Sequence, residues 1–191
     1  MATHNHEVLK VKALEWLYLN AKCKYVATEV PIGKYVFDAV GTNGSNVYII
    51  EAKQERSDFL RECNTIQTIK ENIIKAREQF DLDNDKDEYI KIVSKEKERS
   101  YKFFDDSLLR LSTHRYIICP FGLITEDELP ENWGLLDEEP KVAVKCKGNR
   151  IEQKFAAKIM SAIAKKNTRI MLEGIGVEFG KRTKFPELEL L

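Results

Sequence analysis

Apolar residues recur along this chain with two different periods. Between residues 7 and 20 they recur every three or four positions, at Val8, Val11, Leu14, Leu17 and Tyr18. That spacing predicts an amphipathic helix whose buried stripe these residues form. Three short apolar runs follow at about 24–30, 35–41 and 46–53. Their length and their content of β-branched and aromatic residues predict strands.

The turn between the second and third runs carries a clear local signal. Residues 42–46 are turn formers with Asn43-Gly44 at their centre. An Asn-Gly pair between two alternating apolar runs is a strong hairpin signal, because both residues tolerate positive φ. We therefore expect the second and third strands to pair as a hairpin.

Helices and strands alternate in the rest of the chain. The expected elements are a helix from Ser57 to near Phe80, a charged helix within 91–110, strands at 114–119, 134–137 and 141–146, and a helix at 151–166. The last twenty residues show no firm pattern. Strands interleaved with helices indicate an α/β protein.

Charge and composition narrow the class of protein. The 191 residues carry no net charge, with 43% hydrophobic and 32% charged residues, which is typical of a soluble globular protein. No apolar run approaches the roughly 20 residues that span a bilayer, and the polar start has no signal-peptide pattern. We therefore expect a cytoplasmic protein without membrane contact. The widely separated cysteines Cys23, Cys63, Cys119 and Cys146 predict free thiols rather than a zinc site.

Ionisable residues at the ends of apolar strands suggest chemistry. Asp38 lies in the second strand, and Glu51-Ala52-Lys53 ends the third. Glu51 and Lys53 project from the same side of a strand, and closure of the hairpin at Gly44 brings Asp38 near them. Two carboxylates can hold Mg²⁺ or Mn²⁺ together with substrate phosphate, and the carbonyl of Ala52 is a possible third ligand. Lys53 would position a water or stabilise charge on the phosphate. The alternative is that these residues have no catalytic role. Asp38 would then be a polar residue near the turn, and Glu51 and Lys53 would be a surface pair at the end of the strand.

Several ordered segments together resemble a known superfamily. They are Glu29-Val30-Pro31, Asp38-Ala39-Val40, Glu51-Ala52-Lys53, Ser57-Asp58-Phe59, Arg115-Tyr116-Ile117-Ile118-Cys119-Pro120 and Leu129-Pro130-Glu131-Asn132-Trp133-Gly134-Leu135-Leu136. The set is similar to the PD-(D/E)xK nucleases, in particular the MmcB-like DNA-repair nuclease family and related phage and prophage proteins. The resemblance covers roughly residues 25–63 and 114–147. Phe37 stands where proline is common in the superfamily.

The resemblance implies a fold and a site. The fold would be a restriction-endonuclease-like α/β/α core with a mixed central sheet in one domain over 1–169, with a helical insertion at about 64–113 and a C-terminal extension at 170–191. The activity would be Mg²⁺- or Mn²⁺-dependent hydrolysis of DNA in repair, recombination or phage DNA processing. The catalytic residues would be Asp38, Glu51 and Lys53. A further acid would come from Glu7 or Glu29.

Basic residues are concentrated near the C-terminal end. Between Lys141 and Arg169, nine lysines and arginines are opposed only by Glu152, whereas residues 126–139 are rich in acids. Such a segment can follow a phosphate backbone, or it can be a solvated helix face. With the resemblance, we expect nucleic acid to be bound by Lys145, Lys147, Arg150, Lys154 and Lys158.

Other functions remain open at this point. The chain could be a nuclease-fold protein that binds nucleic acid or a repair partner without cutting. It could also be an interaction protein that docks through residues 64–110, which would otherwise form a lid, a DNA-contacting arm or the hairpin of a homodimer. The sequence does not distinguish single-stranded from duplex substrates, or endonuclease from exonuclease action.

Overall fold

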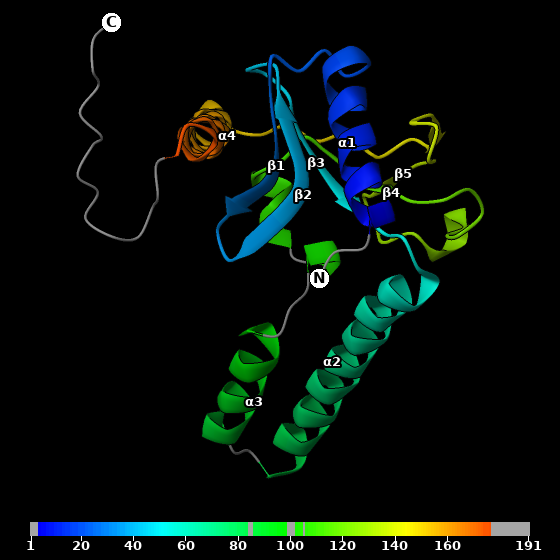
Figure 1. Ribbon diagram of the computed structural model, residues 1–191. Coiled ribbons are helices and arrows are strands. Elements are labelled where there is room, and N and C mark those ends of the chain that lie inside the picture. Colours follow the sequence, from blue (N-terminus) through cyan, green and yellow to red (C-terminus); the bar gives the residue numbers. More distant parts are fainter. Residues whose placement is uncertain (1–3, 84–85, 99–101, 105, 177–191) are drawn as a thin grey trace, which may run out of the picture.

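The computed structural model describes residues 4–83, 86–98, 102–104 and 106–176. In this part of the chain the centre is a six-stranded sheet with its strands in sequence order (Figure 1). The strands are β1 (Tyr25–Ile32), β2 (Tyr35–Thr42), β3 (Val47–Ala52), β4 (His114–Ile118), β5 (Gly134–Leu136) and β6 (Val142–Val144). The first three form an antiparallel meander, β4 and β5 run parallel to β3, and β6 is antiparallel to β5. The sheet is therefore mixed, as predicted.

Helices cover both faces of this sheet. Helix α1 (His4–Leu19) covers one face, and α4 (Gln153–Gly174) lies on the other. The other helices are α2 (Arg56–Asp83) and α3 (Lys86–Glu98), and short 3₁₀ turns form η1 (Lys102–Phe104), η2 (Asp106–Arg110) and η3 (Glu126–Glu128). Since successive strand residues face opposite sides, Ile50 packs with α1 while Ile49 packs with Ile159 and Ile163 of α4. The α/β/α fold class is confirmed.

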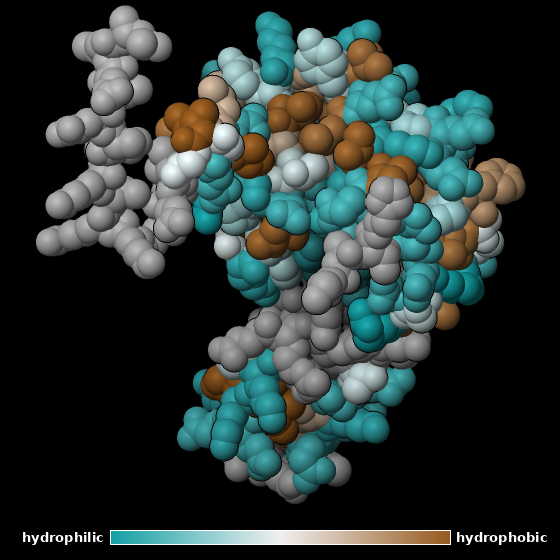
Figure 2. Space-filling view, viewed as in Figure 1, coloured by the Kyte–Doolittle hydropathy of each residue, from teal (hydrophilic) through white to brown (hydrophobic). Residues whose placement is uncertain are grey.

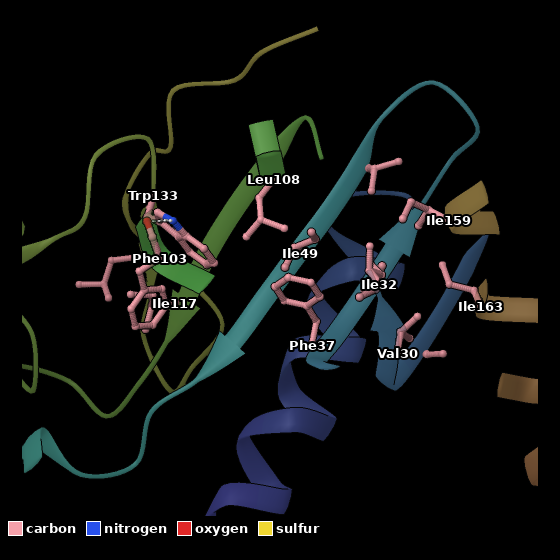
Figure 3. Close-up of a cluster of buried hydrophobic side chains, with 14 of the residues drawn as sticks. Val30, Ile32, Phe37, Ile49, Phe103, Leu108, Ile117, Trp133, Ile159 and Ile163 are labelled. Atoms are coloured by element: carbon pink, nitrogen blue, oxygen red, sulfur yellow. Dashed lines mark hydrogen bonds between the residues drawn. The ribbon is translucent and has the colours of Figure 1, made fainter. Parts of the chain in front are cut away.

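The core on the α4 face is continuous from one end of the sheet to the other (Figure 3). It runs from Ile159 and Ile163 at β1 and β2 to Phe103 and Trp133 beyond β4. The Trp133 indole donates a hydrogen bond to the Phe103 carbonyl at 3.1 Å, and the two rings meet edge to face. This contact fixes η1, where the chain returns from α3, against the sheet.

The predicted buried stripe of α1 is only partly correct. Leu17 is buried and Leu14 packs against the same cluster, but Val8, Val11 and Tyr18 are exposed. The other residues that face the sheet are Leu9, Ala13 and Trp16. The helix is apolar on two sides, and its buried side also carries Lys10. The periodicity therefore identified the helix but could not distinguish its inner face from its outer face.

Three element boundaries differ from the predictions. The first strand continues through Pro31 to Ile32, which is possible because β1 is an edge strand and proline there removes no ladder hydrogen bond. The helix predicted to begin at Ser57 begins at Arg56, and the Ser57 hydroxyl donates a hydrogen bond to the Glu55 carboxylate at 3.3 Å. The third helix occupies Lys86–Glu98 rather than 91–110, and 3₁₀ turns follow it.

The last helix is longer than predicted. It runs past the expected end at 166, and past the domain boundary placed at 169, to Gly174. Its last buried residue is Ile163, and Ile170 and Met171 are exposed. The final turns leave the core, so they carry no buried stripe that periodicity could detect.

The helical insertion consists of two packed helices. Figure 1 shows α2 and α3 extending side by side away from the sheet, and the rings of Phe80 and Tyr89 pack between them with centroids 5.4 Å apart. Figure 2 shows that this region is largely hydrophilic on the face in view, with a few hydrophobic side chains. Among the described residues, no helix is both long and apolar enough to cross a membrane.

Candidate active site

Asp38 and Glu51 meet where β2 and β3 separate. The β2–β3 hairpin is closed by the turn at Gly44, as predicted, and its ladder reaches Ala39 and Ile50. At the next position side chains replace the ladder. The Asp38 amide donates to Oε1 of Glu51 at 3.4 Å, and the Ala52 amide donates to Oδ2 of Asp38 at 2.9 Å. The backbone thus holds both carboxylates at one point of the sheet.

Glu51 is the buried member of this pair. Its side chain is 2% exposed, and burial raises the pKa of its carboxyl to about 8, with a further increase from the nearby Asp38 carboxylate. The ammonium groups of Lys102 and Lys53 act in the opposite direction. A buried carboxyl beside a second carboxylate favours a cation at this place.

Lys102 supplies an ammonium at that place. Its Nζ lies 2.8 Å from Oε2 of Glu51 and donates to the Val36 carbonyl at 2.6 Å. It also lies 5.4 Å from the ring centre of Phe37. The residue comes from η1, after the α3 helix, and no sequence motif marks it. Sequence reasoning missed it because it belongs to a generally charged stretch.

Lys10 forms a second cationic centre on the α1 side. Its side chain is 5% exposed, and its Nζ lies 2.9 Å from Oε1 of Glu7, 3.0 Å from Oε1 of Glu29 and 4.0 Å from Oδ1 of Asp38. Burial lowers the pKa of Lys10, but the hydrogen bonds that it donates to Glu7 and Glu29, together with the nearby negative charges, outweigh burial and raise the net pKa. Glu7 and Glu29, the two predicted accessory acids, therefore both contact the Lys10 ammonium, which in turn lies close to Asp38.

Glu29 has an unusual backbone conformation. It lies opposite Asp38 in the β1–β2 register, between the pairs Thr28–Ala39 and Val30–Phe37, and its φ is +51°. A side chain at positive φ costs about 1–2 kcal/mol relative to glycine. Strained residues of this kind concentrate at functional sites. The hydrogen bond from Lys10 lowers the pKa of the Glu29 carboxyl.

Lys53 is close to the acids but is paired elsewhere. Its Nζ donates to Oε1 of Glu62 in α2 at 2.6 Å and lies 5.4 Å from the ring centre of Phe103. Oε2 of Glu62 is buried with no hydrogen-bond partner within the described structure. Glu62 thus holds the Lys53 ammonium at the edge of the site, a contact that sequence reasoning did not identify.

His6 was also missed, because it lies near the start of the chain. Its Nε2 is 3.6 Å from Oδ2 of Asp38. Its Nδ1 is buried without a hydrogen-bond partner in the part of the chain that the structure describes. Asp38 is therefore flanked on the α1 side by an imidazole and an ammonium.

Asp38 and Glu51 could offer oxygen ligands to a hard divalent cation whose coordination is completed by substrate. The carboxylates of Asp38 and Glu51 are oxygen ligands, and Lys102 already places positive charge on Glu51. No group of three or more His, Cys, Asp or Glu residues in the described chain is arranged to hold a metal ion. The protein would therefore supply two carboxylates, and waters and phosphate oxygens the rest, as is usual for Mg²⁺. The predicted role of the Ala52 carbonyl stays a prediction.

The predicted nucleic-acid-binding residues do not gather at this site. Lys145, Lys147 and Arg150 lie in the irregular segment between β6 and α4, and Lys154 pairs with Glu152. Only Lys158 lines a groove that also contains Glu29. The other basic residues of that groove are Lys165, Lys166 and Arg169, which lie later in α4 than the predicted segment.

Comparisons with known proteins support the fold. The chain matches no protein-family model, and a search of curated proteins gave no match. A solved structure described as the SPO1766 protein of unknown function from Silicibacter pomeroyi superposes with a TM-score of 0.59. That superposition covers 94% of this chain and 99% of the other at 12% sequence identity. At this level of sequence identity the similarity concerns the fold alone.

Proposed function

We propose that this protein is a Mg²⁺- or Mn²⁺-dependent nuclease that hydrolyses phosphodiester bonds in DNA. The observation that carries the proposal is the pairing of Asp38 with Glu51 where β2 and β3 part. The resemblance of the ordered segments to PD-(D/E)xK nucleases agrees with this arrangement. Repair, recombination or phage DNA processing is the proposed setting.

The residues divide the chemistry between them. Asp38 and Glu51 would hold the metal ion. When bound, the metal would polarise the phosphate and lower the pKa of a water molecule. Hydrolysis joins the water oxygen to phosphorus and breaks the bond to an alcohol oxygen, which takes up a proton. Lys53, held by Glu62 beside the acids, would stabilise negative charge on the phosphate. Lys102, which is paired with Glu51, would compete with a metal ion for that carboxylate.

A second function is favoured by the same ammonium groups. Lys102 pairs with Glu51, and Lys10 lies beside Asp38, so the two acids have cationic partners without a metal. A nuclease-fold protein that binds nucleic acid or a repair partner without cutting would keep such an arrangement. Metal affinity distinguishes the two functions.

Cleavage assays test the proposal directly. Purified protein is incubated with Mn²⁺ or Mg²⁺ and labelled single-stranded or duplex DNA. We expect cleavage by the wild type and a loss of about 100-fold or more in Lys53→Ala and Asp38→Asn, since charge stabilisation and metal binding are removed. Lys24→Ala, an exposed lysine before β1, is the matched control. Circular dichroism confirms the fold of each variant. If no DNA or RNA is cut with any divalent metal, the non-cutting function replaces this one.

A further inference from the structure

A groove lies between α4 and the β1–β2 hairpin. It has a volume of about 630 Å³, and its lining includes Glu29, Pro31 and Val36 from the hairpin. The helix contributes a cationic wall, formed by Lys158, Lys165, Lys166 and Arg169. Asn167 holds the helix against β1 by donating a hydrogen bond to the Val26 carbonyl at 3.1 Å. The groove is therefore framed by two elements that are attached to each other.

The charge of this groove is strongly positive although the whole chain is neutral. Four cations face one carboxylate, Glu29, among the lining residues. Lys166 lies 3.5 Å from Oε2 of Glu29, and Arg169 donates to Glu173 at 2.7 Å on the exposed side. Positions 158, 165 and 169 share one side of the helix, since their spacings are close to whole turns, and Lys166 lies at the edge of that side. The rest of the lining is Pro31, Val36, Ser161 and Ala162, so the described lining residues include no aromatic ring on which a base could stack.

The groove is connected to the candidate active site through one residue. Oε2 of Glu29 faces Lys166 in the groove, and Oε1 accepts a hydrogen bond from Lys10, which lies 4.0 Å from Asp38. The left-handed backbone of Glu29 places its carboxylate between the two positive centres. A strand bound along α4 would therefore end at the acid pair.

We propose that this groove binds the sugar-phosphate backbone of the nucleic-acid strand that enters the active site, without reading its sequence. This inference rests on the proposed function, because it takes the Asp38–Glu51 pair to be the active site that the bound strand enters. Lys158 and Arg169 are separated by about 16 Å along the helix axis, so the groove cations can contact several successive phosphates of one strand. Contacts to phosphates alone give affinity without sequence preference. The binding surface is thus later in α4 than the segment predicted from the sequence.

Binding without metal tests the groove separately from catalysis. Fluorescence anisotropy is measured in EDTA with a labelled single-stranded oligonucleotide of mixed sequence, over a series of salt concentrations. The groove variant is Lys158→Ala/Lys165→Ala/Arg169→Ala. The control variant is Lys145→Ala/Lys147→Ala/Lys154→Ala, which removes the same charge outside the groove. Lys166 is kept because it pairs with Glu29.

We expect the groove variant to bind at least about tenfold more weakly at low salt and the control to bind within about twofold of wild type. The slope of log affinity against log salt should fall by about 2 in the groove variant, because each lost single-strand phosphate contact contributes about 0.7. Equal losses in both variants, no loss in the groove variant, or no binding by the wild type overturns the inference. If the groove variant loses binding but the wild type cuts no nucleic acid, the groove stands and the nuclease proposal falls. Thermal melts of each variant confirm folding.

Discussion

Lys102 and Glu51 form an ion pair of 2.8 Å that joins the end of the helical insertion to the buried centre of the sheet. The carboxylate is almost fully buried and the lysine is only partly exposed. The Lys102 ammonium is therefore paired with the Glu51 carboxylate, which would be a ligand of the proposed metal ion. This contact is one of the links between the insertion and the candidate active site.

Replacement of Lys102 should strengthen metal binding. Lys102→Met keeps most of the apolar stem and removes the competing ammonium from Oε2 of Glu51. We expect Mn²⁺ to bind about tenfold more tightly, a change of about 1.4 kcal/mol, as measured by isothermal titration calorimetry. Lys91→Met, on an exposed position of α3, is the control and should not change affinity. Equal or weaker Mn²⁺ binding in Lys102→Met would show that the lysine does not compete with metal.

The stability of the metal-free protein should depend on the protonation of Glu51. Its folded pKa of about 8 lies above the unfolded value near 4.5, so between these values the folded state binds one more proton than the unfolded state. Stability from this group is full below about pH 4.5 and is lost as pH rises toward 8, by up to about 1.4 kcal/mol per unit. Denaturant unfolding from pH 5.5 to 7.5 should show this decrease in wild type relative to Glu51→Gln. Parallel pH profiles for the two proteins would contradict the raised pKa.

The strained backbone at Glu29 can be measured with two variants. Glu29→Ala and Glu29→Gly both remove the carboxylate and its contacts with Lys10 and Lys166. Only glycine adopts φ of +51° without steric cost, so we expect Glu29→Gly to unfold with a free energy about 1 kcal/mol higher than Glu29→Ala. Chemical denaturation at pH 7 gives both values. A more stable alanine variant would mean that the backbone relaxes and stores no strain.

The sheet was predictable because its signals are local. The Asn43-Gly44 turn and the runs on either side fixed the β2–β3 hairpin, and with it the approach of Asp38 to Glu51. The inner face of α1 was not predictable. Val11 and Leu9 are equally apolar in the sequence, and only packing against β2 and β3 decides that Leu9 is inside. The end of α4 was missed for a different reason. Its last turns bury no residue after Ile163, so they lack the periodic apolar stripe by which a helix is recognised in a sequence.

The cations of the site were also beyond sequence reasoning. Lys10, Lys102 and Lys166 come from three separate helical elements, and each looks like an ordinary surface lysine in its local context. Their roles arise from distances to Glu7, Glu29 and Glu51 that only the assembled fold defines. The acids could be proposed from their strand positions, whereas their partners could not.

The location of a bound metal ion tests the central claim most directly. Crystals of the wild-type protein soaked in Mn²⁺ would be measured by anomalous diffraction at the manganese edge. The proposed function predicts one strong anomalous peak between the carboxylates of Asp38 and Glu51, with Lys102 withdrawn from Glu51, and no such peak in Asp38→Asn crystals. Fully soaked crystals with no peak at the acid pair, and with Lys102 still 2.8 Å from Glu51, would contradict a metal-dependent nuclease centre.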